Sequence, residues 1–227
     1  MSRSYVLLIG VCILTIGVLM LNIAVVNKRQ PQLMRWVCIG LFTFSMMRYL
    51  TLIVYGDSPT LSQLEILRYF YFATSIGLTM TTAAAVWWMS PYIRENLSYG
   101  SYLLSFIPFI AFYLWVLITQ PTEIRMGETY GYTLALVGKY PIYLAIVQSL
   151  FVGIIIILCV TGILKYKNAE LRNKYGLVIG AQVLLALDGI SFFKPILEVF
   201  PPFTVTELLG FLVILQVFQT ETIKKGR

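Results

Sequence analysis

The sequence contains no histidine, and this absence removes several kinds of chemistry at once. Without an imidazole the chain has no histidine-ligated metal site, no Ser-His catalytic pair and no histidine to phosphorylate. Cysteine is also scarce: Cys12, Cys38 and Cys159 all lie in apolar runs, and none has the CxxC spacing of a metal or redox site. We expect these thiols to be small buried hydrophobic groups, and we expect no bound metal and no cofactor.

Charged residues are few as well, at 12% of the chain against roughly a quarter in an ordinary globular protein. Hydrophobic residues make up 59% and form repeated apolar runs of about 20 residues, the length of a membrane-spanning helix. The net charge is +7, yet the basic residues separate the apolar runs instead of clustering on one soluble face. This pattern is typical of a polytopic membrane protein, and it argues against binding to nucleic acid.

We predict an all-α polytopic membrane bundle of seven transmembrane helices, which forms a single integral membrane domain over residues 1–227. The first apolar run is longer than the h-region of a signal peptide and ends without a cleavage pattern, so we expect it to be retained. The predicted spans cover about residues 5–26, 34–55, 61–90, 102–118, 142–163, 175–193 and 202–219.

Lysine and arginine are unevenly distributed between the two ends of these helices. One set of ends carries eleven of them: Lys28, Arg29, Arg35, Arg94, Lys165, Lys167, Arg172, Lys174, Lys224, Lys225 and Arg227. The other set carries four: Arg3, Arg125, Lys139 and Lys194. Because the side richer in these residues is the cytoplasmic one, we predict a multi-pass protein of the cell membrane with its N-terminus outside and its C-terminus in the cytoplasm.

Four charged residues deep inside the predicted spans are candidates for a site: Arg48, Arg68, Asp188 and Glu207. The two carboxylates belong to an apolar hairpin, Ala186–Gly210, whose proline-rich turn holds Glu198. A helix rises about 1.5 Å per residue, and this spacing places all four charges in the outer half of the membrane. Lone charges at that depth cost several kcal/mol each, so we expect Asp188 or Glu207 to pair with Arg48 or Arg68.

Two interpretations of these charges remain open. In the first, they are structural ion pairs that fix the helices near the outer interface. In the second, they surround a polar pocket between the second, third, sixth and seventh spans, where a small ligand, a lipid head group or an ion binds. The substitution Asp188→Asn separates the two, since it abolishes a response without affecting folding if the pocket is functional. Loss of expression or of monodispersity indicates the structural role instead.

Small residues indicate where the helices approach one another closely. The run Thr79–Ala85 is more typical of close helix packing, with threonine hydroxyls bonding between helices, than of a substrate path. Gly176 and Gly180 have the spacing of a second close approach. In the fourth span, Pro108 predicts a kink. In the longest loop, Tyr130–Val137 is expected to form a short strand or an interfacial element.

The longest outer loop carries the sequence YGY at Tyr130–Tyr132, and the most basic loop enters the sixth span as LRNKYG at Leu171–Gly176. The last span follows the turn Pro201–Pro202. Together with seven spans, this layout resembles the N-terminal seven-helix sensor region of certain bacterial membrane histidine kinases. The resemblance implies a bacterial sensor region. With no kinase core and no histidine to phosphorylate, it is expected to act through a partner's cytoplasmic domain or as a regulator in its own right.

We therefore predict a non-enzymatic sensory or regulatory membrane protein that binds a ligand or partner and relays a signal to a cytoplasmic partner. The expected partners are the lipid bilayer, a membrane or cytoplasmic signalling protein, and a second copy of the chain. A retinal protein is excluded because the seventh predicted span has no lysine. The paired aspartates, Ser-His pair or zinc ligands of an intramembrane protease are missing too. The alternative is a small-solute or ion transporter that uses the buried carboxylates.

Overall fold

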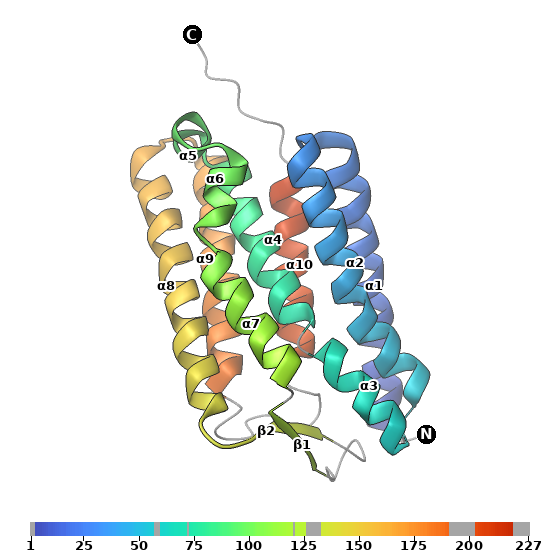
Figure 1. Cartoon of the computed structure of the whole chain (residues 1–227). Coiled ribbons are helices and arrows are strands. Elements are labelled where there is room, and N and C mark those ends of the chain that lie inside the picture. The colour runs from blue at the N-terminus through green and yellow to red at the C-terminus, as the bar shows by residue number, and fades with distance from the viewer. Residues whose placement is uncertain are drawn as a thin grey trace.

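The computed structural model describes residues 3–56, 60–71, 73–119, 121–125, 133–190 and 203–219, which form a bundle of α-helices with one small β-hairpin (Figure 1). The first half of the chain contains α1 (Arg3–Arg29), α2 (Gln32–Tyr55), α3 (Leu61–Tyr71), α4 (Ala73–Met89), α5 (Pro91–Asn96), α6 (Tyr99–Leu104) and α7 (Ile107–Thr119). The second half contains β1 (Thr122–Arg125), β2 (Thr133–Leu136), α8 (Tyr140–Lys165), α9 (Ala169–Ile190) and α10 (Thr204–Gln219). The predicted helical bundle is thereby confirmed.

Three of the described helices, α1, α2 and α8, are long and apolar enough to cross a membrane. The helices α7 and α10 are also apolar but shorter. Large hydrophobic side chains remain exposed on the outside of the bundle, among them Leu14, Trp36 and Ile157. Such a surface is stable in contact with lipid chains and unstable in water. The chain is therefore a membrane protein, as its composition predicts.

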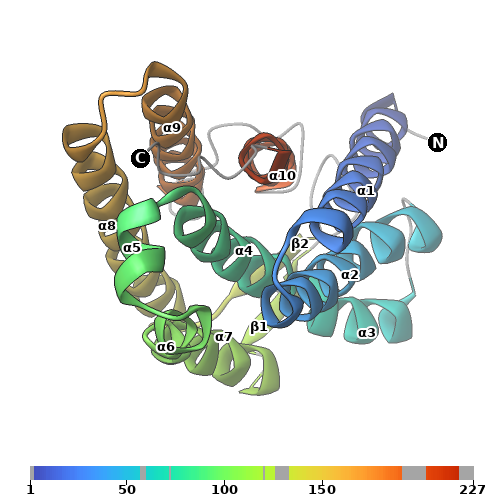
Figure 2. The same cartoon turned by 90° about the horizontal axis from the view of Figure 1, so that it is seen from above.

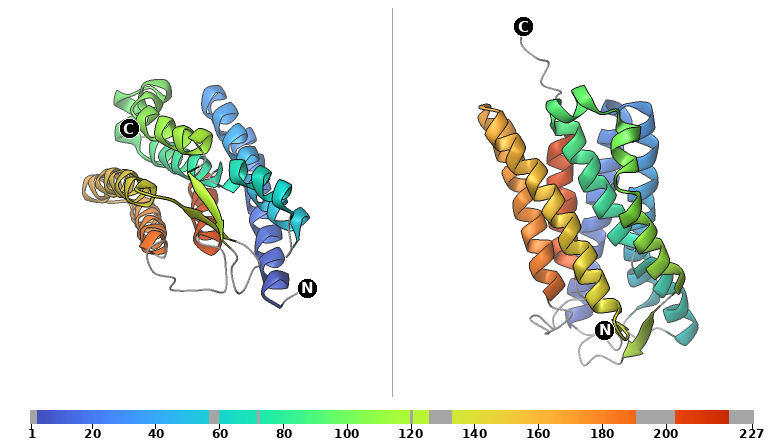
Figure 3. Two further views of the ribbon diagram at one scale, coloured as in Figure 1. Left: turned by 60° about the horizontal axis from the view of Figure 1, so that its bottom comes forward. Right: turned by 60° about the vertical axis from the view of Figure 1, so that its left-hand side comes forward.

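The helices α4 and α10 occupy the middle of the bundle when it is viewed from above (Figure 2). Helices α1, α2 and α3 lie on one side of them, and α8 and α9 lie on the other. Helix α10 packs against α1, α4 and α9, while α8 packs along α9. The two further views show the same arrangement (Figure 3). The last described helix thus contacts helices from both halves of the sequence.

The two ends of the bundle differ in charge. The start of α1, the β-hairpin and the start of α8 share one end, which we call the hairpin end (Figure 1). The opposite end holds α5, α6 and the connections that follow α1 and α8. We call it the basic end, because it carries Lys28, Arg29, Arg94, Lys165 and Lys167.

Two of the predicted spans correspond to two described helices each. In the region predicted as one helix over 61–90, α3 ends at Tyr71 and α4 begins at Ala73, and the residue between them lies outside the described residues. In the fourth predicted span, α6 ends at Leu104 and α7 begins at Ile107. Pro108 explains this second break, since its ring has no N–H to donate and clashes with the carbonyl four residues earlier. Proline is tolerated in the first turn of a helix, and Pro108 lies in the first turn of α7. The chain therefore has a break between two helices where the sequence predicts a kink within one.

A β-hairpin precedes α8 at the hairpin end. Strand β1 pairs with β2 in antiparallel register, with Thr122 opposite Leu136 and Arg125 opposite Thr133. Strand β2 lies within Tyr130–Val137, the segment expected to form a short strand or an interfacial element.

Two glycines bring neighbouring helices close together. A Cβ added to Gly77 on α4 would lie 1.8 Å from the Ser45 hydroxyl of α2, and one added to Gly162 on α8 would lie 2.3 Å from the Tyr175 ring of α9. A side chain at either position would force the neighbouring side chain to move, so glycine allows the close approach. By contrast, a Cβ on Gly176 or Gly180 would meet no atom within 4 Å. The close approach predicted at those two residues is therefore not found within the described part of the bundle.

Candidate functional site

Arg48 on α2 and Glu207 on α10 form a buried ion pair. The Arg48 Nη1 atom lies 2.6 Å from the Glu207 Oε1 atom, and the two residues are 1% and 3% exposed. Arg48 belongs to a buried stripe of α2 with Ser45 and Leu52, whose spacing of three or four residues keeps them on one face of the helix. Two of the four charges singled out in the sequence, which are 159 residues apart, thus meet inside the bundle.

Two further side chains complete the coordination of the Glu207 carboxylate. The Tyr49 hydroxyl donates a hydrogen bond to Oε2 at 2.6 Å, and the Thr74 hydroxyl on α4 donates to Oε1 at 2.7 Å. Arg48 Nη1 also donates to the Thr74 hydroxyl at 2.8 Å. A buried charge pair is stable only when such bonds satisfy its remaining lone pairs. The four residues therefore form one network that joins α2, α4 and α10.

Asp188 on α9 has a different role. Its Oδ2 atom accepts a hydrogen bond from the Phe203 backbone N–H at 2.9 Å and another from the Thr206 hydroxyl. These donors belong to the first turn of α10 and the residue before it, where backbone N–H groups lack helical partners. Phe203 has φ +67°, a left-handed conformation that is uncommon for a residue with a side chain. Asp188 thus fixes the start of α10 against the end of α9.

The side chains of the remaining charged candidates lie outside what the structure describes. Arg68 lies in α3, but its side chain is outside what the structure describes. Glu198 and the turn Pro201–Pro202 lie in the segment 191–202, also outside the described residues. Of the predicted pairings, the structure therefore gives the one between Arg48 and Glu207.

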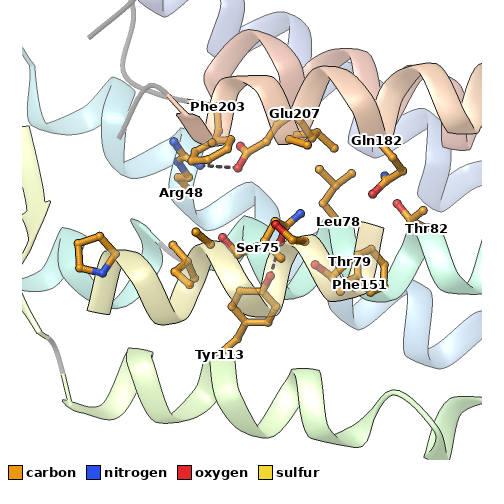
Figure 4. Close-up of a pocket in the computed structure, with 18 residues that line it drawn as sticks. Arg48, Ser75, Leu78, Thr79, Thr82, Tyr113, Phe151, Gln182, Phe203 and Glu207 are labelled. Carbon is orange, nitrogen blue, oxygen red and sulfur yellow. Dashed lines mark hydrogen bonds and ion pairs between the residues drawn. The ribbon is translucent and has the colours of Figure 1, made fainter. Parts of the chain in front are cut away.

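A cavity of about 140 Å³ lies beside the ion pair, between α2, α4, α7, α8, α9 and α10 (Figure 4). Pro141 near the start of α8 and Gly189 near the end of α9 line it toward the hairpin end, and Thr82 lines it near the middle of α4. Arg48 and Glu207 contribute to its wall together with Phe203. The cavity therefore extends from near the hairpin end to the middle of the bundle.

The cavity wall combines apolar and hydrogen-bonding groups. Its apolar part includes Leu78, Leu144, Phe151, Leu185 and Phe203. Its polar part includes Ser75, Thr79, Thr82, Tyr113, Gln148, Ser149 and Gln182. The Tyr113 hydroxyl on α7 donates a hydrogen bond to Gln148 Oε1 on α8. Gln182 on α9 is only 2% exposed, and its Oε1 atom has no hydrogen-bond partner.

The predicted role of Thr79–Ala85 is only part of what that run does. All seven of its residues are buried in α4, as expected of a packing segment. However, Thr79 and Thr82 also line the cavity, so one face of the run borders a space in which a ligand can bind. The same segment of α4 therefore packs against neighbouring helices and also lines the cavity.

The most informative residues that sequence reasoning missed are uncharged. Tyr49, Thr74 and Gln182 have no charge to mark them, and hydroxyls or amides in a membrane helix often bond to their own backbone. The available signal is that Gln182 is the one amide side chain in an otherwise apolar run from Tyr175 to Leu187.

The site has the components of a binding site. Among the described residues, no group of three or more histidine, cysteine, aspartate or glutamate side chains is placed to hold a metal ion. The Glu207 carboxylate is already bonded to three side chains, and its bonding favours holding helices in place over proton transfer to a substrate.

No family model, curated protein or solved structure matches the chain.

Proposed function

We propose that this protein is a non-enzymatic sensory or regulatory membrane protein that binds a small ligand in the cavity and relays the binding event to a cytoplasmic partner. The observation that carries the proposal is that two residues of the ion-pair network, Arg48 and Glu207, also line the cavity. A ligand in the cavity therefore contacts the residues that hold α10 against α2 and α4. Ligand binding changes an equilibrium only through such differential contacts.

Seven spans are proposed for the bundle: α1, α2, α3 with α4, α6 with α7, α8, α9 and α10. The hairpin end is then outside the cell and the basic end is cytoplasmic, because lysine and arginine are retained preferentially on the cytoplasmic side. Under this orientation the cavity lies in the outer half of the membrane, and the end of α10 lies at the cytoplasmic side.

The contacts of α10 support a relay across the membrane. At the hairpin end, Asp188 bonds to Thr206 in its first turn, and the next residue, Glu207, binds Arg48. At the basic end, the Arg29 guanidinium of α1 donates a hydrogen bond to the Gln219 carbonyl, near the last turn of α10. A shift of α10 at the cavity therefore changes a contact at the cytoplasmic end of the same rigid helix. The resemblance to sensor regions of bacterial histidine kinases agrees with this role.

The proposal is tested by purifying the tagged protein from its native membrane in mild detergent and identifying bound proteins by mass spectrometry. We expect a stoichiometric partner with a cytoplasmic signalling or enzymatic domain, whose crosslinks fall on the basic end at Lys165 or Lys167. The variant Glu207→Gln should alter the yield of this complex, because it weakens the network that holds α10. A clean monomer or homo-oligomer would contradict the relay.

A transporter is the alternative, and the position of Glu207 in the cavity wall is the observation that favours it. Proton-coupled carriers use carboxylates buried in this way. In proteoliposomes with a pH-sensitive dye, a proton flux that Glu207→Gln abolishes would favour transport. The sensory proposal predicts no flux above that of empty liposomes.

A further inference from the structure

The amide of Gln182 is directed into the cavity from α9, on the same side as Thr82 of α4 (Figure 4). The residue is 2% exposed, and its Oε1 atom is buried without a hydrogen-bond partner. Buried polar atoms in proteins nearly always have a partner, because water solvates them well and apolar surroundings do not. A buried amide oxygen facing a cavity therefore indicates that the partner is a molecule inside the cavity.

The charges around the cavity indicate that this molecule is uncharged. Arg48 and Glu207 are the only charged residues among the described ones that line it. They neutralise each other at 2.6 Å, and Tyr49 and Thr74 satisfy the carboxylate further. A charged ligand would have to leave water without gaining a counterion, and this transfer is strongly unfavourable.

The volume and the apolar wall indicate the size and shape of the molecule. The cavity measures about 140 Å³. A cavity of roughly 150 Å³ holds one benzene ring. Leu78, Leu144 and Phe151 give it the apolar surface that contacts such a ring, while Thr82 and Gln182 form a polar part. The ligand is therefore about the size of a single ring and polar at one edge.

We propose that the cavity binds a small uncharged ring compound that carries a hydroxyl group, such as a phenol or a cyclic alcohol, with Gln182 as the anchoring residue. A hydroxyl both donates and accepts hydrogen bonds, so it pairs with the Gln182 amide in either orientation of that group. The ring then lies against the apolar wall and the ion pair stays intact. This inference rests on the proposed function, since it names the ligand class of the same site.

The experiment uses the full chain in lipid nanodiscs and two fluorinated probes, 4-fluorophenol and 4-fluorotoluene. The probes have nearly the same shape, but only the phenol carries a hydroxyl group. Binding is measured by broadening of the ¹⁹F NMR signal relative to nanodiscs without protein. We expect saturable broadening with 4-fluorophenol and much weaker broadening with 4-fluorotoluene, because the latter leaves the Gln182 amide unpaired.

Two matched variants connect the binding to the site. Gln182→Leu keeps the side-chain volume and removes the amide, so it should weaken 4-fluorophenol binding by about tenfold or more. Gln216→Leu makes the same change at an exposed position on α10 that does not line the cavity, and it should bind as the wild type does. Without probe, Gln182→Leu should unfold at the same temperature as the wild type or higher, since it removes an unpaired buried amide.

The inference is overturned if both probes bind equally, if Gln182→Leu binds 4-fluorophenol as well as wild type, or if Gln182→Leu is strongly destabilised without probe. The first two results indicate a cavity occupied by water or apolar molecules alone, and the third indicates a structural amide. These results are independent of the purification experiment. A cytoplasmic partner without phenol binding refutes the ligand class alone, whereas phenol binding without a partner refutes the relay and leaves the site.

Discussion

At the scale of single residues, Glu207 depends on its neighbours more than any other described side chain of the site. Its carboxylate is 3% exposed and bonds to Arg48, Tyr49 and Thr74. A buried pair of this kind adds little stability compared with an apolar pair of the same volume, but loss of one partner is severe because the other charge stays buried.

Arg48→Met should therefore lower the free energy of unfolding by about 3–5 kcal/mol. The double variant Arg48→Met with Glu207→Leu should lose much less, since both charges leave the bundle together. Unfolding in mixed detergent micelles, followed by circular dichroism, measures both losses. Additive losses in the double variant would mean that the two side chains do not interact.

Glu170 provides the control for this prediction. Its carboxylate lies 2.6 Å from the Lys174 ammonium group, and its side chain is 68% exposed. Solvent screens an exposed carboxylate, so Glu170→Gln should leave the stability nearly unchanged. A separation of 2.6 Å therefore contributes less to stability when the carboxylate is exposed than when it is buried.

Sequence reasoning anticipated a charge pair in the bundle but not which one. The cost of a lone charge in a membrane required partners for Arg48 and Glu207, and that argument uses only composition and depth. The choice among the candidate pairings depends on how each helix is rotated about its axis, which a single sequence does not contain. The sequence does not single out Gln182, because burying an uncharged amide in a membrane costs far less free energy than burying a charge. Its amide is nevertheless the group that faces the cavity.

At the scale of helices, the contact between α8 and α9 depends on Gly162. A Cβ there would lie 2.3 Å from the Tyr175 ring, and the Tyr175 hydroxyl holds that ring in place by donating to the Ser90 hydroxyl at 2.9 Å. The ring cannot swing aside without losing this hydrogen bond. Overpacking of a contact between two helices is therefore expected to be costly at this position.

Gly162→Ala should destabilise the protein by about 1–3 kcal/mol, because the new methyl group separates the two helices. Gly153→Ala, in the same helix, serves as the control, since a Cβ there would meet nothing within 4 Å. It should be neutral or stabilising by up to about 1 kcal/mol, the difference in helix propensity between the two residues. Equal melting temperatures for the two variants would show that α8 and α9 do not make this contact.

Helix positions were predicted better than helix continuity. The predicted spans 34–55 and 142–163 agree with α2 and α8 to within two residues at each end. The sequence predicts a kink at Pro108 where the structure has a break between α6 and α7, because the pattern of apolar residues continues across the break. Hydropathy records which residues face lipid, and it does not record where backbone hydrogen bonds stop.

At the scale of the whole molecule, the orientation in the membrane is open to a direct test, and the native cysteines do not interfere with it. Cys12, Cys38 and Cys159 are all 0% exposed, so the wild type should react little with a membrane-impermeant maleimide. Lys139 and Lys167 are exposed and lie at opposite ends of α8. They are suitable positions for single reporter cysteines.

In intact cells, Lys139→Cys should be labelled by the impermeant maleimide, and Lys167→Cys should be labelled only after permeabilisation. This result follows from the proposed orientation, in which the basic end is cytoplasmic. The reverse pattern would invert the proposed orientation. Labelling of both from the same side would show that α8 does not cross the membrane.

The ion pair beside the cavity also determines how the protein experiences the electrical potential of a living membrane. Moving a single elementary charge across that potential is worth about 2.3 kcal/mol per 100 mV, which makes isolated charges effective voltage sensors. Arg48 and Glu207 carry opposite charges and are bonded to each other, so their joint movement transfers no net charge through the field. When α2 and α10 shift together, the voltage does almost no work on this pair. Under the proposed sensory function, the response to a ligand should be alike in energised and depolarised cells.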